Sequence, residues 1–374
     1  MVENRFLLTV ACAIMRLDSL IIFMGLKVGI VGLPNVGKST LFNAITKQSI
    51  PASNFPFTTI EPNVGIINVP DDRIAKLAVL EKSEKQVPAT IEFVDIAGLV
   101  KGASEGAGLG NKFLSHIREV DAIVQVVRFF ENKDIIHVDG SINPARDMDV
   151  INLELMLADL STVLKRLESV ARDLKSGNKE AAFLKTGLEK IHVALEDGKP
   201  ASSVELTEDE KKQIDQLQLL SMKPILYVAN TSDKTVAPLN GNELLPIDIK
   251  IEAELSELAD EDRGEYMKDL GIEESGLDRL ARAAYSLLNL ITYFTAGPME
   301  TKAWTILRGT KAPGAAGVIH TDFEKGFIKA EVIGWDKLLE AESYATARDK
   351  GWLRLEGKEY VVIDGDVCHF RFNN

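Results

Sequence analysis

A glycine-rich turn between two regular segments constrains this chain more than any other feature of its sequence. Residues 32–40 read Gly-Leu-Pro-Asn-Val-Gly-Lys-Ser-Thr. The apolar residues 26–31 before the turn predict a buried strand, and residues 41–45 after it have helical character. A Gly-x-x-x-x-Gly-Lys-Ser turn between a strand and a helix wraps the backbone around a phosphate group. We therefore predict an α/β fold of the P-loop nucleotide hydrolase type.

The chemistry of phosphate binding assigns roles to the residues of this turn. Gly32 and Gly37 let the backbone bend tightly enough for successive N–H groups to point at the β-phosphate. Lys38 supplies a compact positive charge to the β- and γ-phosphates, which makes it a catalytic candidate, and the Ser39 hydroxyl is a ligand for Mg²⁺. The predicted nucleotide-binding residues of the turn are Gly32, Asn35, Val36, Gly37, Lys38, Ser39 and Thr40.

A second motif predicts where the metal ion and the γ-phosphate are sensed. Residues 89–94 read as a strand that ends in Asp95-Ile-Ala-Gly98, the Asp-x-x-Gly of a GTPase. Asp95 is expected to hold Mg²⁺ through a water molecule, and the Gly98 N–H to contact the γ-phosphate. The glycine-rich residues 101–110 are a candidate switch II, a segment whose order depends on the bound nucleotide.

Residues 55–63 look like a switch I segment. From their resemblance to the Obg-type pattern, Thr59 is expected to complete the Mg²⁺ shell and to sense the γ-phosphate.

The group that orients the attacking water stays open. Many GTPases place glutamine directly after Asp-x-x-Gly, but this chain has Leu99, whose apolar side chain cannot align a water molecule. Slow basal hydrolysis is therefore expected, unless another group takes over. Asn35 resembles the asparagine of potassium-activated members, in which a K⁺ ion supplies the missing charge. His137 is the other candidate, although a lone histidine is more often structural.

A third motif marks the expected base-binding segment. The apolar residues 224–230 predict a strand that ends in Asn230-Thr231-Ser232-Asp233, in the place of the guanine-reading Asn-Lys-x-Asp. In that motif the acidic group accepts hydrogen bonds from guanine while the lysine stem packs along the ring. Thr231 replaces the lysine, so part of this grip is lost. Asn230, Thr231 and Asp233 are the predicted base-reading residues.

Taken together, these segments resemble the YchF/Obg-like ATPase family. The resemblance rests on residues 32–40, 54–63, 92–104 and 321–328, and it runs from Met24 to the C-terminus. It implies a preference for ATP over GTP, Mg²⁺ dependence and association with the ribosome. The family usually has Glu where this chain has Asp233, and the usual small-residue fifth motif is not visible in residues 245–252. GTP use, alone or beside ATP, therefore remains an alternative.

A helical insertion is predicted at residues 152–219. Leucine and alanine residues alternate four and three apart, which is a heptad seam. The seam consists of Leu153, Leu157, Leu160, Leu164, Leu167, Ala171 and Leu174. A second stripe follows at Leu184, Leu188, Ile191 and Leu195. Thr207 with Glu210 predicts a capping box for a third helix. An antiparallel hairpin would bury both apolar stripes against each other. It is either purely structural or an arm that docks a partner.

The sequence pattern changes from helical to mainly strand-like at residues 289–372, which predicts a separate C-terminal module. Strand-like residues 304–307, 327–333 and 360–363 surround one helical segment at 335–342, a content that suits a small β-grasp fold. The family resemblance implies a TGS domain here, associated with ribosome or RNA contact. From Thr292 onward 11 Lys and Arg face 12 Asp and Glu, so RNA is repelled less by this module than by the acidic remainder.

Length and composition set the remaining limits. A chain of 374 residues predicts two or three domains, here a nucleotide domain at 26–288 and the C-terminal module. Its net charge of −13 argues against a general polyanion binder. Two cysteines are too few for a disulfide framework, and no apolar stretch reaches the about 18 residues of a membrane span. We therefore expect a cytoplasmic protein, monomeric and without membrane contact.

Residues 1–23 weakly resemble a signal peptide, but we interpret them as a non-native extension or a misplaced start.

Two functional classes are compatible with these motifs. In the first, the chain is a ribosome-associated ATPase that works as a nucleotide-dependent switch. In the second, it is a GTP-binding or dual-specificity scaffold with negligible turnover, which Leu99 favours. A metabolic kinase is a distant third, because no separate acceptor pocket is recognisable.

Overall fold

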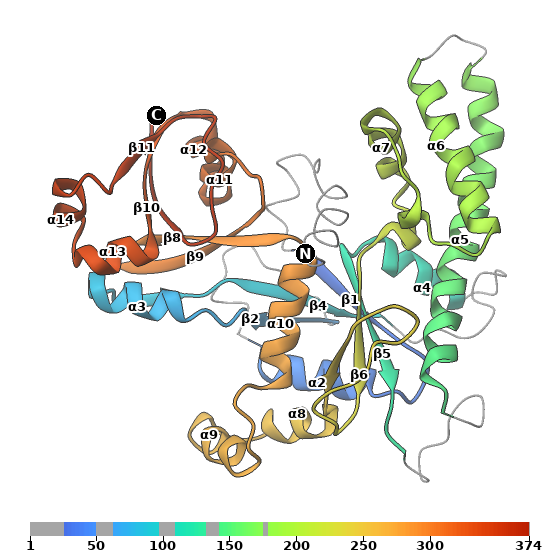
Figure 1. The fold of residues 1–374 in the computed structure, drawn as a ribbon, viewed down its shortest axis with the longest axis horizontal. Helices are drawn as coiled ribbons and strands as arrows, with labels where there is room; N and C mark the ends of the chain where they lie inside the picture. Colours follow the sequence, from blue (N-terminus) through green and yellow to red (C-terminus); the bar gives the residue numbers. More distant parts are fainter. Residues whose placement is uncertain (1–25, 50–62, 97–108, 132–141, 175–178, 374) are drawn as a thin grey trace. The chain divides into compact units, whose positions relative to one another are not determined.

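The computed structural model describes residues 26–49, 63–96, 109–131, 142–174 and 179–373 (Figure 1). The chain forms two compact units. The nucleotide unit comprises Lys27–Gly65 and Phe93–Gly276, and the C-terminal unit comprises Ile66–Glu92 and Leu277–Asn374. The predicted N-terminal extension, residues 1–23, lies outside the described residues.

A six-stranded sheet forms the centre of the nucleotide unit (Figure 1). Its strand order is β2-β4-β1-β5-β6-β7, and β1, β5, β6 and β7 run parallel. Every residue of β5 is buried, as expected for an apolar central strand covered on both faces. The strands are β1 (Lys27–Val31), β2 (Val64–Asn68), β4 (Thr90–Asp95), β5 (Ala122–Arg128), β6 (Ile225–Asn230) and β7 (Leu244–Ile247).

The helices of this unit include one that starts inside the glycine-rich turn. They are α2 (Lys38–Lys47), α4 (Leu109–Arg118), α8 (Ile249–Leu255) and α9 (Asp260–Asp269). The predicted strands at 26–31, 89–94 and 224–230 are present as β1, β4 and β6, each within one residue of its expected bounds. The predicted α/β fold class is confirmed.

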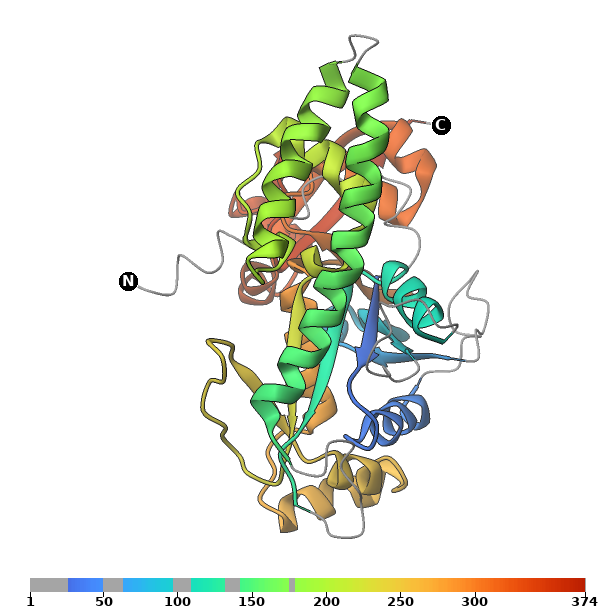
Figure 2. The same cartoon turned by 90° about the vertical axis from the view of Figure 1, so that its right-hand side faces the viewer.

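A helical arm follows β5, as Figure 2 shows. It consists of α5 (Pro144–Asp173), α6 (Lys179–Glu196), η4 (Ala201–Ser203), α7 (Glu208–Ile214), η5 (Asp215–Leu217) and η6 (Leu220–Met222). The second predicted stripe, on α6, is buried in the core between α5, α6 and α7. The predicted capping box is also present, because the Thr207 N–H donates to Glu210 and the Glu210 N–H to the Thr207 hydroxyl.

The first predicted stripe is only half correct. Leu160, Leu167 and Leu174 pack into the core of the arm, but three other seam leucines do not. The side chains of Leu153, Leu157 and Leu164 are 50%, 41% and 43% exposed. For Leu153 and Leu157 the reason is that the start of α5 packs against the sheet. It buries other positions, including Met148, against the sheet, and the buried face then turns toward α6.

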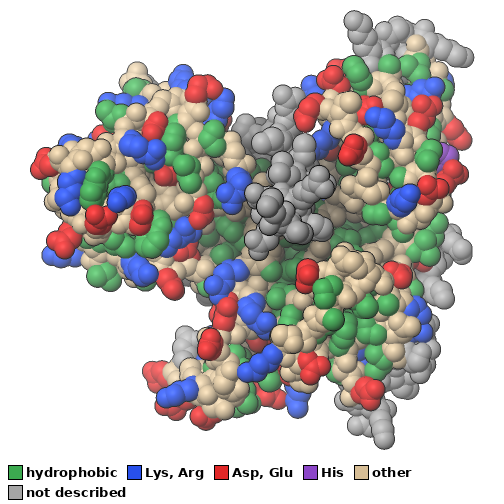
Figure 3. Space-filling view, in the orientation of Figure 1, with side chains coloured by type: hydrophobic (Ala, Val, Ile, Leu, Met, Phe, Trp, Pro, Cys, Tyr) green, Lys and Arg blue, Asp and Glu red, His purple; other side chains and the backbone are tan. Residues whose placement is uncertain are grey.

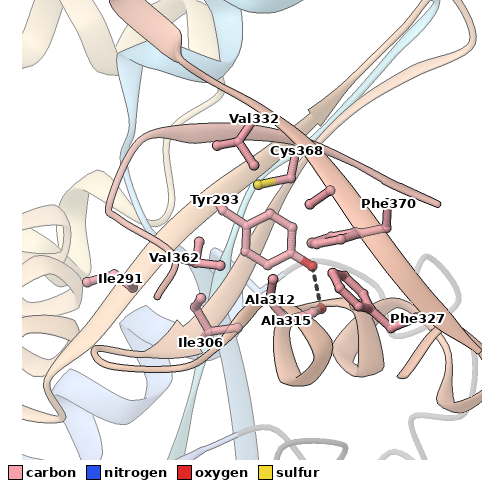
Figure 4. Close-up of a cluster of buried hydrophobic side chains, with 12 residues drawn as sticks. Ile291, Tyr293, Ile306, Ala312, Ala315, Phe327, Val332, Val362, Cys368 and Phe370 are labelled. Atoms are coloured by element: carbon pink, nitrogen blue, oxygen red, sulfur yellow. Dashed lines mark hydrogen bonds between the residues drawn. The ribbon is translucent and has the colours of Figure 1, made fainter. Parts of the chain in front are cut away.

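A second sheet organises the C-terminal unit, with strand order β11-β10-β12-β8-β9-β3. Its strands are β3 (Lys85–Val87), β8 (Leu290–Ala296), β9 (Glu300–Leu307), β10 (Phe327–Gly334), β11 (Arg354–Glu356) and β12 (Asp366–Phe372). Its helices are α3 (Asp72–Glu81), α10 (Gly276–Leu287), α11 (Ala312–Ile319), α12 (Thr321–Lys325), α13 (Trp335–Ala341) and α14 (Tyr344–Asp349). Tyr293 lies in the core between this sheet and α11, where its hydroxyl donates to the Ala315 carbonyl at 2.9 Å (Figure 4).

Two expectations for this unit are wrong. Residues 360–363 do not form a strand; they contribute one isolated bridge, between Lys311 and Val361. The strands that pair with β10 are β11 and β12, and in β12 Phe370 and Phe372 alternate with His369 and Arg371. The module also has more than the single helix expected at 335–342, which is present as α13.

Residues 66–92 belong to the C-terminal unit although they precede Asp95 in the sequence. Strand β3 pairs in parallel with β9 at the edge of the sheet. The Arg73 guanidinium of α3 contacts the Asp364 carboxylate at 2.6 Å and stacks over the Phe294 ring. Among the helices described for both units, none is long and apolar enough to cross a membrane.

Candidate functional site

The glycine-rich turn lies at the carboxyl end of β1, and its two glycines are required by close contacts. A Cβ atom at position 32 would lie 2.7 Å from the Val126 carbonyl oxygen of β5. Gly37 has a φ of +105°, and a Cβ there would lie 2.6 Å from the Asn230 side-chain nitrogen. Contacts below 3.0 Å leave no room for a side chain, so the backbone itself lines the turn. This is the property that phosphate binding through N–H groups requires.

Lys38 is held inside this turn. Its side chain is 8% exposed, and its Nζ donates to the Leu33 carbonyl at 2.7 Å. Burial lowers the pKa of Lys38 from 10.5 to about 8, and the nearby Asp95 carboxylate partly opposes this shift. Burial therefore disfavours the charged form of Lys38, and a negatively charged ligand next to Nζ would stabilise it.

Asp95 brings a carboxylate to the same edge of the sheet. It is the last residue of β4, and its N–H donates to the Asn63 carbonyl at 3.1 Å. Burial raises the pKa of Asp95, while the charge of Lys38 lowers it. Ser39 and Thr40, on the first turn of α2, are exposed. The structure thus places Lys38 and Asp95 close enough to influence each other electrostatically, as their predicted roles require.

The donor set fits Mg²⁺. Ser39 and Asp95 offer a hydroxyl and a carboxylate oxygen, the hard ligands that this ion prefers. Within the described residues, no group of three or more His, Cys, Asp and Glu side chains forms a metal cage. Mg²⁺ commonly completes its shell with water and nucleotide phosphates rather than with protein groups, so a site with few protein ligands is what its chemistry calls for.

Asn230 is predicted to read the base. In the structure its side chain links the end of β6 to the glycine-rich turn and to the start of α8. Its side-chain Nδ2 donates to the Val36 carbonyl of the turn at 2.9 Å. Its Oδ1 accepts from the Ile249 N–H, at the start of α8, at a longer 3.4 Å. The side chain is 9% exposed. Asn230 therefore acts as a positioning residue that fixes the turn relative to the loops beyond β6 and β7.

The other two predicted base-reading residues differ in exposure. Thr231 is 6% exposed; its N–H donates to the Ile247 carbonyl, and its hydroxyl accepts from the Asp233 N–H, both at 3.1 Å. The Asp233 side chain is exposed. The Asp233 carboxylate is thus accessible to solvent.

Ile249 lies beside the turn and Asn230, and this was not predicted because the expected small-residue motif is not visible in residues 245–252. In the structure β7 ends at Ile247, and the half-buried Asp248 caps α8. Its Oδ1 accepts from the Lys250 N–H at 3.1 Å and from the Ile251 N–H at 3.2 Å. An aspartate directly before the apolar residues of α8 is a helix-start signal that could have revealed this position.

Several predicted site residues lie outside the described residues, and their roles stay predictions. They are Thr59 of the expected switch I, Gly98 and Leu99 after Asp95, the expected switch II up to residue 108, and His137.

Comparison with known proteins finds relatives along almost the whole chain. The "Ribosome-binding ATPase YchF" of Bacillus subtilis is 54% identical over 365 residues, which cover 94% of this chain and 100% of the relative. The chain belongs to the YchF family. Proteins of the same description from Pasteurella multocida and Escherichia coli O157:H7 are 52% and 50% identical, each over 94% of this chain and 100% of the relative. The family resemblance predicted from the motifs is confirmed.

Two family models match separate parts of the chain. Residues 27–155 match the family described as "50S ribosome-binding GTPase", and residues 290–373 match the YchF-GTPase C-terminal family, described as a protein of unknown function. The solved structure of the Schizosaccharomyces pombe YchF GTPase is similar with a TM-score of 0.81 and 39% sequence identity. It covers 93% of this chain and 98% of the S. pombe chain. The fold described above is thus the YchF fold.

Proposed function

We propose that this chain is a Mg²⁺-dependent ATPase that binds the ribosome and works as a nucleotide-dependent switch. The observation that carries the proposal is the buried Lys38 ammonium, enclosed by a backbone turn and near the Asp95 carboxylate. The relatives described as ribosome-binding ATPases support both parts, since they match along their entire length. We propose a cytoplasmic location, because the proposed partner is the ribosome.

The proposed chemistry follows from the residues of the site. The N–H groups of the turn and the Lys38 ammonium bind the β- and γ-phosphates and offset the charge that develops on the leaving group. Ser39 and Asp95 would hold Mg²⁺, which supplies further neutralisation of phosphate charge when bound. Asn230 keeps the Val36 peptide of the turn aligned through its 2.9 Å hydrogen bond.

Activation of the attacking water is proposed to fall to a group other than residue 99. Leucine has no polar atom with which to orient water. His137 and a K⁺ ion near Asn35 are the two candidates. Asn35 has a left-handed backbone with φ of 62° and an exposed position on the turn, which supports a role at the surface of the bound phosphates. Thr59 and Gly98 are proposed to respond to the γ-phosphate.

The C-terminal module is proposed to be a TGS domain that takes part in ribosome or RNA contact, and the arm to be a coiled-coil insertion. Acidic and basic side chains are interspersed over each unit on the face drawn in Figure 3. This distribution supports local contacts with the ribosome rather than the broad electrostatic binding of a polyanion. We propose that the protein acts as a monomer and makes no membrane contact.

The test compares Lys38→Ala with Lys47→Ala. Both positions lie on α2, but Lys47 is exposed and pairs with Glu257 at the far end of the helix. Fluorescent ATP binding and phosphate release are measured for both variants, with and without ribosomes and K⁺. Lys38→Ala should lose binding or turnover and Lys47→Ala should keep both. Unchanged ATP affinity in Lys38→Ala would contradict the proposal.

The alternative is a nucleotide-gated scaffold with negligible turnover, selective for GTP or accepting both nucleotides. It is favoured by Leu99. Stimulation of turnover by about tenfold or more on addition of ribosomes or K⁺ supports the switch. An unchanged rate, together with ribosome pull-down that depends on the nucleotide, supports the scaffold.

A further inference from the structure

The C-terminal unit exposes part of one face of its sheet, along the paired strands β10 and β12. Alternate residues of a strand point to opposite faces of the sheet. One set lies in the core that these strands share with α11 and consists of Ala330, Val332, Cys368 and Phe370. The residues between them therefore lie on the other face, here called the outer face, and are Lys329, Glu331, His369 and Arg371.

Two cations lie directly opposite each other on the outer face. Lys329 of β10 and Arg371 of β12 are cross-strand partners, and both side chains are exposed. Like charges at directly opposed positions of an antiparallel pair destabilise the sheet. This pairing does not help the sheet to fold, and it is the arrangement that an anionic ligand would stabilise.

A single carboxylate on the outer face offsets part of this charge. Glu331 forms an ion pair with Arg371 at 3.4 Å and lies 4.0 Å from the guanidinium of Arg348 on α14. The two arginine side chains are still 50% and 65% exposed. Among the described residues, the Lys329 side chain makes no hydrogen bond or ion pair. Three cations thus surround one carboxylate, and the outer face is positive.

Two further side chains give the outer face more than charge. His369 lies two residues from Arg371 on the same strand, and its ring is exposed. Leu355 of β11 pairs with Glu331 and is 63% exposed. RNA-binding proteins contact phosphates through arginine and lysine, and they stack unpaired bases on histidine rings and guanidinium planes, in some modules on the open face of a sheet. The outer face offers both kinds of contact.

We propose that the outer face binds RNA of the ribosome. Lys329, Arg371 and Arg348 contact phosphate groups, and His369 lies against the bases. The proposal rests on the ribosome contact proposed above and names the surface that makes it. The net charge of −13 repels phosphates, but salt screens this repulsion beyond about 8 Å, so a local basic surface can still hold RNA at short range.

The experiment uses the full chain and a double variant, Lys329→Gln with Arg371→Gln, which removes two charges and keeps long polar side chains. The control is Lys311→Gln with Lys325→Gln. Lys311 and Lys325 are exposed and lie at α11 and α12, which pack on the other face of the sheet. Lys311 pairs with Glu359 as Arg371 pairs with Glu331, so the two double variants are matched. Thermal unfolding and basal ATP hydrolysis should be unchanged in both.

Binding to intact ribosomes and to ribosomal RNA stripped of protein is measured at several salt concentrations. The outer-face variant should bind both about tenfold or more weakly, and the slope of log affinity against log salt should fall by about 1.5, the value for two lost phosphate contacts. The control should match the parent in affinity and slope.

Unchanged affinity and slope in the folded outer-face variant overturn the proposal while the ribosome-binding function stands. Weaker binding to ribosomes with unchanged binding to stripped RNA also overturns it, because the partner of the outer face is then a ribosomal protein. Failure of the parent chain to bind ribosomes overturns both the proposal and the ribosome contact on which it rests.

Discussion

The buried ammonium of Lys38 predicts that nucleotide binding takes up a proton. In the free protein burial lowers the pKa of Lys38 to about 8, so near pH 8 half of the molecules lack this charge. The phosphates of a bound nucleotide offset the burial by bringing negative charge next to Nζ, and they should return the pKa to its ordinary value of 10.5 or higher. Only the protonated form binds phosphates well, so binding and protonation are linked.

The magnitude follows from the two pKa values. The difference between 10.5 and about 8 corresponds to about 3 kcal/mol, which is the cost of burying the charged side chain in the free protein. Binding at pH 8 should take up about 0.5 proton per nucleotide, falling to about 0.1 at pH 7 and rising to about 0.9 at pH 9. Affinity for MgATP should consequently be about tenfold weaker at pH 9 than at pH 7.

Calorimetric titration with MgATP in buffers of different ionisation enthalpy measures this uptake directly. The control is Lys223→Arg. Burial also lowers the pKa of Lys223, which donates to the Arg118 and Val120 carbonyls. Arginine keeps the cation but does not titrate in this range. Proton uptake that is absent at pH 8, or that disappears in Lys223→Arg, would refute the reasoning.

The lowered pKa of Lys38 also makes the stability of the free protein depend on pH. Between about pH 8 and 10.5 the unfolded chain holds more protons at Lys38 than the folded chain, so this group makes the free protein more stable as pH rises through that window. Lys38→Met removes the buried charge at neutral pH. It should raise the free energy of unfolding by about 1–2 kcal/mol, less than the full 3 because the Leu33 carbonyl loses its donor. Chemical denaturation at pH 7 measures this gain, and a loss of stability would contradict it.

Three further substitutions test a residue that positions the turn, a candidate catalytic residue and a buried residue that stabilises the helical arm. Asn230→Ala should weaken ATP and GTP binding alike, by about tenfold, because the turn loses its bond to Val36; unequal loss in parallel nucleotide titrations would instead indicate base reading. His137→Ala should lower kcat more than affinity in steady-state and binding measurements, and equal losses would move it to a structural role. Asp159→Ala should lower the free energy of unfolding by about 3 kcal/mol in denaturant, because its buried carboxylate accepts from the Leu220 N–H and from the N–H and hydroxyl of Ser221. Nucleotide affinity should not change in that variant.

The phosphate-binding part of the site could be predicted because its constraints are local. Strand, turn and helix follow one another in residues 26–45, and the close contacts at Gly32 and Gly37 restrict those positions to glycine. The base-binding part depends on contacts between distant segments. Asn230 fits the sequence pattern of a base reader, yet its amide bonds to Val36 and Ile249, and the sequence does not show that the start of α8 lies beside it.

Helix α5 shows why periodicity alone gave the wrong buried face. A heptad pattern identifies leucines on one side of a helix, but it does not say what the helix packs against. Met148 is buried near the start of α5, where the neighbour is the sheet, whereas Leu167 packs where the neighbour is α6. A 30-residue helix that changes its neighbour changes its buried face as well, so Leu157 of the predicted seam remains exposed.

The placement of residues 66–92 could not be predicted for a similar reason, and it bears on how a switch would work. Strand β3 pairs with β9, and Arg73 forms an ion pair with Asp364; both partners are far away in the sequence. The predicted switch I precedes β2, and Asp95 ends β4, so the segment between them is part of the C-terminal unit. Both connections to that segment therefore come directly from the nucleotide site. A rearrangement of switch I or of the residues after Asp95 would therefore act at the ends of β2 and β4, the strands that lead into and out of residues 66–92.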